Sequence, residues 1–425
     1  MKNLFKMSSE ERSWVLYDVG NSAFVLVMVT AIMPIFYKDI AASHLPNAIS
    51  TAHWGFANSA ASLILALLAP LLGTMADYRQ RKRLFFLCFL ALGLSFTTAL
   101  SFIVEGQWLL CLLMFVAARV GWAGANIFYD AFLVDVTTRE RMDSVSSLGY
   151  ALGYIGSVIP FLLIIGLILK GGLSGGLPAT ETRIGFVIVA VWWLLLAIPA
   201  MKNFKQRHFL PSTATPVAAG FKRLWHTLTD IKKHKQVFLF LAAYFFYIDG
   251  VGTIITMSTA YGRDLGFDIP LLIAVLLFIQ IVAFPFALLY GRLALVFGTR
   301  NMLLAGIMVY CLITLLAFLL PSLASYQSKT MLFWIIAFLV ASAMGGIQAL
   351  SRSYFARLIP PQRSAEFFGF YNVFGKFATI SGPFLMGMVG GLTGDTRWGV
   401  LSIVVLFVLG AVILGKVDES EAQSD

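Results

Sequence analysis

Charged side chains are scarce in this sequence. Only 12% of its 425 residues are Asp, Glu, Lys or Arg, whereas 59% are hydrophobic. A soluble domain has roughly 25% charged residues, and half that share cannot give a soluble protein of this size a water-compatible surface. The composition therefore excludes a soluble globular protein and predicts one whose surface faces lipid.

Motifs of enzyme chemistry are lacking as well. The chain contains no HExxH, CxxC, P-loop or GxSxG motif, so no motif indicates catalysis or ATP binding. Its cysteines, Cys88, Cys111 and Cys311, all lie inside apolar stretches and indicate neither a disulfide framework nor a zinc site. We expect a protein that is not an enzyme, needs no cofactor and takes its energy from a gradient or a partner.

Long apolar stretches dominate what is present. A helix needs about 20 apolar residues to cross a ~30 Å hydrocarbon core, and twelve stretches of this kind follow one another. They lack the strict alternation of a transmembrane barrel, and their internal Gly and Pro residues are tolerated in membrane helices. The sequence predicts an all-α membrane protein with helices over 14–37, 52–76, 82–104, 108–134, 145–169, 183–201, 236–260, 269–291, 300–320, 330–351, 366–391 and 397–415.

Basic residues give the orientation of these helices. Lys and Arg favour short cytoplasmic loops, and most of the 31 in this chain fall in the N-terminal segment and in every second loop. Both termini are therefore predicted to be cytoplasmic. The net charge of +10 is explained by this bias facing an anionic leaflet, so no nucleic-acid partner is expected. Short outer loops favour a bacterial cytoplasmic (inner) membrane.

The longest polar stretch, 202–235, divides the chain into two six-helix halves, 1–201 and 236–425. Apolar residues recur at helical spacing between Phe221 and Ile231, with Lys and Arg between them. This pattern predicts an amphipathic helix on the inner leaflet. One interpretation is a tether that sets the distance between the halves, and the other is a regulatory site for lipid or a partner.

The halves echo each other in sequence. Gly73-Thr-Met-Ala-Asp77 corresponds to Gly291-Arg-Leu-Ala-Leu295, and Tyr129-Asp-Ala-Phe-Leu133 corresponds to Tyr354-Phe-Ala-Arg-Leu358. Both pairs are separated by about half of the chain length, which indicates duplication. Parallel repeats of this kind place a substrate site near the membrane midplane between the halves, with alternating access by rocking.

The loop Gly73–Arg83 resembles the signature loop between helices two and three of the major facilitator superfamily. It has the Gly, an acid four residues later at Asp77, and a basic cluster from Arg81, but Gln80 stands where the family usually has Gly. The resemblance implies a twelve-helix major facilitator fold in which Asp77 caps helix eleven and holds the outward-facing gate, as a carboxylate at a helix N-terminus can. The alternative is topological anchoring by the basic cluster. Leu295 replaces the acid in the second copy, which argues against gating by that loop.

A narrower likeness to the UMF1 or Atg22-like family extends through both halves. It implies an exporter of amino acids or related metabolites, because fungal vacuolar members are similar to amino-acid effluxers. Apart from this resemblance, we expect a monomer. The segments that carry it are Ser13–Phe24, Asn126–Leu133, Tyr244–Val251, Gly345–Phe355, Phe367–Tyr371 and Gly382-Pro383.

Three ionisable residues fall near the middle of predicted helices. Arg119, Asp249 and Lys376 each lie at least nine residues from a helix end, where a charge is costly and marks a functional candidate. We expect them to bind an anionic or zwitterionic solute, with Arg pairing a carboxylate. Asp249 would receive an ammonium group or a coupling proton. The alternative is a buried ion pair that only joins two helices.

A second set lies nearer the cytoplasmic ends. Asp18, Asp130 and Arg352 are predicted to form a gating network together with the signature-loop residues Gly73, Asp77 and Arg81. Neutral polar groups on the same helices complete the candidate solute site, although polar side chains also join helices in lipid. These groups are Asn21, Asn126, Tyr129 and Gln348.

The leading functional prediction is a secondary active transporter that exports a small polar metabolite by alternating access, with membrane lipids around it and protons as the candidate coupling ion. The alternatives are a proton-linked exporter of drugs or amphiphiles, and a non-transporting receptor or lipid-handling protein of the same fold.

Overall fold

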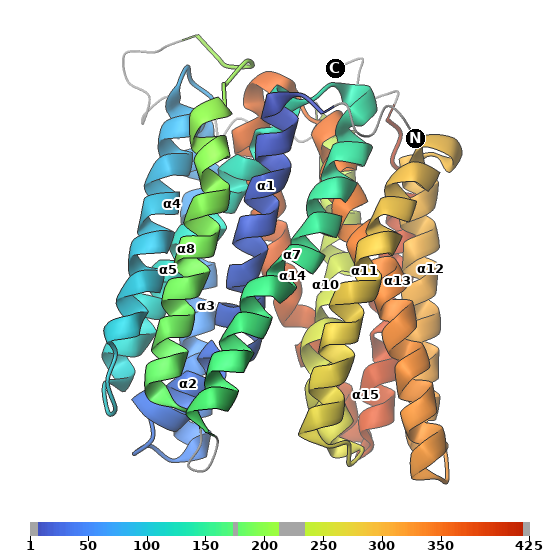
Figure 1. The fold of residues 1–425 in the computed structure, drawn as a ribbon. Coiled ribbons are helices and arrows are strands. Elements are labelled where there is room, and N and C mark those ends of the chain that lie inside the picture. Colours follow the sequence, from blue (N-terminus) through green and yellow to red (C-terminus); the bar gives the residue numbers. More distant parts are fainter. Residues whose placement is uncertain (1–6, 173–176, 212–233, 420–425) are drawn as a thin grey trace. The chain divides into compact units, whose positions relative to one another are not determined.

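The computed structural model describes residues 7–172, 177–211 and 234–419 (Figure 1). Within these ranges eleven helical segments are long and apolar enough to cross a membrane. The 30-residue helix α14, Ser364–Thr393, adds a twelfth long helix. The predicted amphipathic helix within 202–235 falls mainly on 212–233, which lies outside the described residues.

The chain divides into two compact units. Unit 1 comprises the described residues of 1–138, 152–224 and 361–369. Its first crossing begins with α1 and continues through π-helical turns. The elements are α1 Ser9–Phe24, π-helical Val25–Ala31, α2 Met33–Phe36, π-helical Tyr37–Ala41, α3 Asn47–Ala76, α4 Arg81–Ala99, α5 Trp108–Ala131, α6 Leu133–Val136, most of α7 Met142–Gly171, and α8 Ala179–Asn203.

Unit 2 comprises the described residues of 139–151, 225–360 and 370–425. Its last crossing is broken into two short helices. The elements are α10 Lys235–Asp264, α11 Ile269–Phe297, α12 Thr299–Leu319, α13 Tyr326–Leu358, most of α14, α15 Thr396–Ser402 and α16 Val404–Leu414.

Two helices contribute to both units. The first ten residues of α7 group with unit 2, and the first six of α14 group with unit 1. The start of each of these helices thus groups with the other unit, which a division at the linker alone does not describe. The polar clusters of both units form around these two helix starts.

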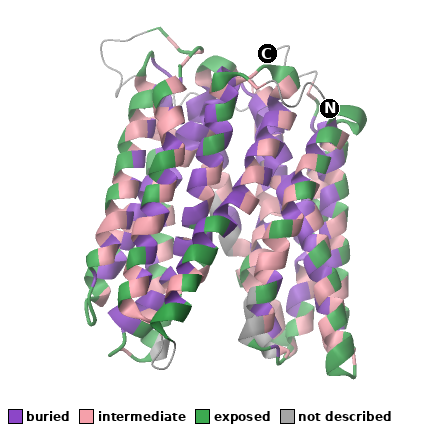
Figure 2. Cartoon of the chain, in the orientation of Figure 1, coloured by how far each residue is buried: buried purple, intermediate pink, exposed green. Residues whose placement is uncertain are grey.

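Local sequence signals account for the helix boundaries. Ser8 and Glu11 form a reciprocal capping box at the start of α1, and Asp268 and Ser325 cap α11 and α13 through their side chains. Large apolar side chains are exposed along the helices, with Leu67 of α3 71% exposed (Figure 2). In a soluble protein such a surface would aggregate, whereas in lipid it is the expected exterior.

Aromatic side chains fill the core of unit 1. Trp14 stacks on Tyr129 with ring centroids 4.5 Å apart, and its indole N–H donates to the Tyr129 carbonyl at 2.9 Å. Tyr17 packs against both Tyr129 and Phe86. These contacts fix the rotation of α1 against α5, and therefore which polar groups the two helices present to each other.

Candidate functional site

Polar groups of α1 and α5 form a directed hydrogen-bond chain in unit 1. The Asn21 amide donates to the Asp18 carboxylate at 3.3 Å, and the Asn21 carbonyl oxygen accepts from Trp122 Nε1 at 3.2 Å and Asn126 Nδ2 at 3.3 Å. The same amide also donates to the Tyr17 carbonyl at 3.1 Å, so its acceptors on α1 together determine which way the Asn21 side chain points. Asn21 in turn orients Asn126, whose buried Oδ1 has no hydrogen-bond partner among the described residues.

Arg119 lies two helical turns before Asn126 on the same face of α5. Its side chain is half-buried and has no hydrogen-bond or ion-pair partner within the described part of the chain. One face of α5 therefore carries both free donors and a free acceptor. Trp122, between them, belongs to this polar stripe and was missed by sequence reasoning, because an indole in an apolar stretch looks like a lipid anchor.

Asp249 occupies a separate polar cluster in unit 2. Its carboxylate is fully buried and accepts the Gly382 backbone N–H at 2.9 Å and the Ser381 hydroxyl. The approach of α10 to α14 is so close here that a Cβ at Gly382 would lie 1.9 Å from Thr253 Oγ1. The glycine is therefore required by contact, and it leaves Asp249 held by neutral donors.

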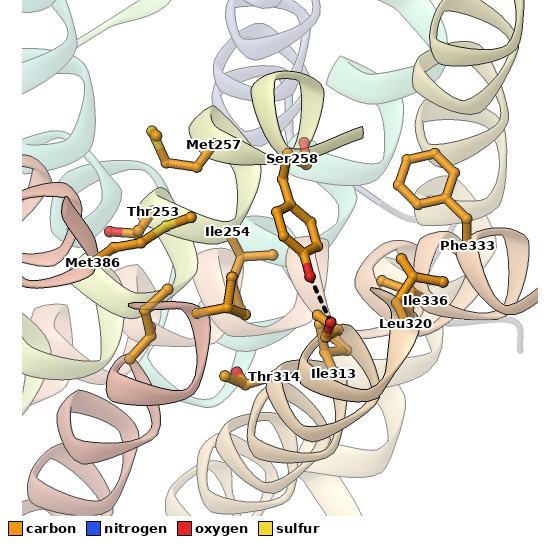
Figure 3. A pocket seen from close by; sticks show the side chains of 14 residues that line it. Thr253, Ile254, Met257, Ser258, Ile313, Thr314, Leu320, Phe333, Ile336 and Met386 are labelled. Atoms are coloured by element: carbon orange, nitrogen blue, oxygen red, sulfur yellow. Dashed lines mark hydrogen bonds between the residues drawn. The ribbon is translucent and has the colours of Figure 1, made fainter. Parts of the chain in front are cut away.

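A small cavity of about 50 Å³ begins at Thr253, one turn beyond Asp249 on α10 (Figure 3). Its walls are apolar and include Met257, Met386 and Phe333. On one side Tyr261 donates to the Ala317 carbonyl at 2.9 Å, the bond drawn in Figure 3. The cavity can accept an apolar group, and the described residues of its lining include no charged side chain.

The remaining predicted site residues are distributed over both units. Arg352 is buried in unit 2, where it donates to the hydroxyl and carbonyl of Ser146 and lies over the Tyr150 ring, 4.4 Å from its centroid. Gln348 is half-buried one turn before Arg352 on α13. Asp130 is half-buried at the end of α5. The side chain of Lys376 lies outside the described residues.

The signature loop contacts the start of α14 within unit 1. The buried Asp77 carboxylate accepts the backbone N–H groups of Ala365 at 2.9 Å and Glu366 at 3.2 Å. Gly73 allows this contact, since a Cβ there would lie 2.4 Å from the Ala365 carbonyl oxygen. Asp77 thus caps a helix that begins at Ser364, using the charge that favours a helix N-terminus.

The cation buried at the end of this loop is Lys82, the residue after the gating candidate Arg81. Lys82 Nζ is 2.7 Å from Asp135 Oδ2 and 2.7 Å from Ser364 Oγ, and both charged side chains are fully buried. Arg81 is half-buried with no side-chain partner among the described residues. We refer to Asp77, Lys82, Asp135 and Ser364 as the latch. Asp135 follows the repeated segment that ends at Leu133, the one sequence signal that pointed near it.

The backbone at Gln80 shows why the signature pattern usually has Gly at this position. Its φ of 64° makes it the only non-glycine residue with positive φ in the described chain, and it directly precedes α4. This left-handed conformation suits glycine, the residue that the pattern usually has there. The fold therefore keeps the turn and accepts the strain of a side chain.

Unit 2 has a corresponding cluster at the start of α7, which sequence reasoning did not identify. The buried Asp143 accepts from Thr299 Oγ1 at 2.6 Å and Arg357 Nη1 at 2.7 Å, and from the Ser353 hydroxyl. Gly291, the counterpart of Gly73, lies against Ser147 of the same helix. The three partners come from α12 and α13, far from α7 in sequence, so no local motif could identify the cluster.

Comparison with known families matches residues 45–425 to the model described as "Vacuole effluxer Atg22 like". An uncharacterised MFS-type transporter, YxiO of Bacillus subtilis, is 47% identical over 418 residues, which cover 97% of this chain and 96% of that protein. Autophagy-related protein 22-1 of Neosartorya fischeri is 24% identical over 66% of this chain, and this match spans only 49% of the fungal protein.

Solved structures share the architecture at low identity. The proton:xylose symporter XylE aligns with a TM-score of 0.70 and 11% identity over 96% of this chain and 94% of that chain. A bacterial homologue of the iron transporter ferroportin, in an outward-facing state, aligns with a TM-score of 0.70 and 13% identity over 98% and 99%. These likenesses establish the fold, and the predicted twelve-helix major facilitator architecture is confirmed.

Proposed function

We propose that this chain, which belongs to the vacuole effluxer Atg22-like family and has the major facilitator fold, moves a small polar solute across the membrane by alternating access. The coarse class, an MFS-type transporter and not an enzyme, follows from the relatives. Beyond this class, we propose which kind of solute is carried, that its transport is coupled to protons, and that it is exported.

The observation that supports this proposal most is the unsatisfied polar face of α5. Within the described residues, the Arg119 guanidinium and the buried Asn126 Oδ1 have no hydrogen-bond partner, although leaving such groups unpaired in a membrane protein is costly. A solute with a carboxylate for Arg119 and an N–H or O–H donor for Asn126 would satisfy both. Amino acids and related anionic or zwitterionic metabolites meet this requirement. Tyr129 and Gln348 belong to the proposal from their places in the sequence.

Asp249 is proposed to carry the coupling proton. It is buried and its bonding partners are all neutral, so binding of a proton would not break an ion pair. Either protonation state can be accommodated: the ionised form accepts the Ser381 hydroxyl, and the protonated form can donate. Lys376, on the same helix as Ser381, belongs to this proposal from its place in the sequence.

The latch is proposed to hold one side of the transporter closed. Asp77 and Gly73 bring α3 to the start of α14, so separation of these helices must break two hydrogen bonds to a buried carboxylate. Asp18, Asp130, Arg81 and Arg352 are proposed to respond as access alternates. Export from a bacterial cytoplasm, with both termini cytoplasmic, agrees with the family description as effluxers and with the positive-inside pattern.

The test is solute uptake by the purified protein in proteoliposomes, after a thermal-shift screen against amino acids, peptides, nucleosides and amphiphiles has identified a ligand. Arg119→Gln should abolish saturable transport of the identified solute, while Arg292→Gln, an exposed arginine, should leave it unchanged. Unchanged transport of every anionic and zwitterionic ligand by Arg119→Gln would refute the assignment. Asp249→Asn should lose the response to a pH gradient but keep solute counterflow.

A second candidate, export of drugs or amphiphiles, is favoured by the apolar cavity beside Thr253. In the same screen, stabilisation by amphiphiles but by no amino acid would support it. Ala317→Leu, which reduces the cavity, should then weaken amphiphile binding while leaving any amino-acid response intact.

A further inference from the structure

The segment after α8 is bonded to the latch. We call residues 204–210 the strap. Leu210 N–H donates to the Asp77 carbonyl at 2.9 Å, and Tyr78 and Leu210 form a parallel β-bridge. The Gln206 side chain donates to the Ala76 carbonyl at 3.1 Å. The strap therefore runs along the same backbone turn that presents Asp77 to α14.

The strap also shares the latch carboxylate. Asp135 Oδ1 accepts the backbone N–H groups of Arg207 and His208 at 2.9 Å each and lies 3.1 Å from His208 Nδ1. Its other oxygen, Oδ2, takes Lys82. The two oxygens of one buried carboxylate thus join the strap to the latch, and displacement of the strap would remove two backbone donors and the His208 ring from Asp135.

Five cations without an acidic partner among the described residues lie on the strap and on the segments next to it. None of them has an acidic partner in the described ranges, because the nearby acids are already engaged: Asp77 by α14, Asp135 by Lys82 and Glu10 by Arg207. The loop that bears three of these cations runs beside the strap, with Arg83 donating to the Met201 carbonyl and Arg79 lying over the Phe209 ring. We call this group the basic patch, and it consists of Arg79, Arg81, Arg83, Lys202 and Lys205.

The basic patch stands at the ends of two helices that are long enough to cross a membrane. α4 begins at Arg81 and α8 ends at Asn203, both are long enough to cross a membrane, and they pack side by side (Figure 1). Leu84 is 54% exposed one turn into α4, and Phe209 of the strap is 38% exposed. Cations at a helix end with exposed apolar groups beside them fit an anionic headgroup with its acyl chain, whereas a free phosphate would use only the cations.

We propose that the basic patch binds the headgroup of an anionic phospholipid and that this holds the strap on the latch. The occupied site would neutralise cations that otherwise repel one another across Arg79, Arg83, Lys202 and Lys205. Relief of this repulsion favours the arrangement in which the loop and the strap run together. Lipid composition would then bias the latch without contact with the solute, so the effect of lipid does not depend on which solute is carried.

The test uses the full chain in nanodiscs of phosphatidylcholine with and without phosphatidylglycerol. Native mass spectrometry should show phosphatidylglycerol retained by the wild type and bound about thirtyfold more weakly by Arg79→Gln/Lys205→Gln, since each of the two cations removed contributes about 1 kcal/mol near the surface. The matched pair Arg292→Gln/Lys416→Gln removes the same charge from exposed, unpaired positions in unit 2 and should change binding less than about twofold. Equal weakening by both pairs, or by neither, would overturn the site.

Two further arms examine the ligand and its effect. Soluble glycerol phosphate should not displace the lipid, and efficient displacement would show a free-phosphate site instead. Hydrogen–deuterium exchange of the strap backbone should slow when phosphatidylglycerol is added to the wild type, but not in Arg79→Gln/Lys205→Gln. Lipid binding with no change in strap exchange would refute the link to the latch.

Discussion

Replacement of Lys82 by Met is the most informative test of the latch. The ammonium group is fully buried and has three acceptors, Asp135 Oδ2 at 2.7 Å, Ser364 Oγ at 2.7 Å and the Ala131 carbonyl at 3.4 Å. Met keeps most of the side-chain volume and removes the charge. The substitution therefore isolates the electrostatic contribution from packing.

Coulomb attraction between Lys82 and Asp135 at 2.7 Å is about 6 kcal/mol at an effective dielectric constant of about 20, but desolvation of both ions offsets much of it. The loss of stability is therefore set mainly by the buried charge that remains without its partner. Removing one member of a buried pair costs roughly 3–5 kcal/mol. After Lys82→Met, Asp135 keeps the donors of Arg207 and His208, so we expect a loss near 3 kcal/mol. Asp135→Leu leaves both the Lys82 ammonium and the strap N–H groups without their carboxylate acceptor, and should lower the unfolding free energy by about 5 kcal/mol.

Reversible unfolding in mixed micelles of zwitterionic detergent measures these changes without anionic lipid. The double variant Lys82→Met/Asp135→Leu should lose less than the sum of the single losses by about 2–3 kcal/mol. Arg81→Met, one residue earlier and without a side-chain partner in the described part of the chain, should change the unfolding free energy by less than about 0.5 kcal/mol. Additive losses, or a loss for Arg81→Met as large as that for Lys82→Met, would refute the buried-pair reasoning.

Other substitutions test neighbouring contacts in the same unfolding assay. Gly382→Ala places a Cβ 1.9 Å from Thr253 Oγ1 and should destabilise the protein by about 1–3 kcal/mol, whereas Gly387→Ala on the same helix meets nothing within 4 Å and should be neutral or stabilising. Gln80→Gly relieves a left-handed backbone and should stabilise by up to about 1 kcal/mol, whereas Gln80→Val should destabilise by at least that amount. Asp143→Asn weakens bonds to its arginine and threonine partners and should cost about 1.5–3 kcal/mol.

Hydropathy predicted the helices well but not their polar ends. The predicted helix 330–351 extends in the structure through Leu358, and 145–169 begins earlier, at Met142. The extra turns hold Arg352, Arg357 and Asp143, which lower the local hydropathy and yet are buried in unit 2 or nearly so. An apolar scale cannot identify residues that stay helical at a membrane boundary because protein groups, rather than lipid, surround them.

Candidate site residues could be found from the cost of burying a charge, but their partners could not. The position of Arg119 in the middle of a helix identified it, whereas only the structure distinguishes a free Arg119 from a paired one. Lys82 and Arg81 are adjacent and chemically alike, and a 100° step around the helix decides which is buried. The hydrogen bonds of Asp135 join residues from three sequence regions, so no spacing within one segment reveals them.

Both units have a buried carboxylate at a helix start, but it comes from a different element in each. In unit 1 the loop supplies the acid, Asp77, to backbone donors at the start of α14. In unit 2 the acid stands in the first turn of α7 itself, at Asp143, and receives donors from Thr299 and Arg357. A first-turn carboxylate already favours the α7 dipole, so the loop has no need of one, and its Leu295 is 58% exposed. The loss of the acid from the second signature loop is therefore not a loss of buried contacts at the helix start, because Asp143 of α7 is bonded to α12 and α13 instead.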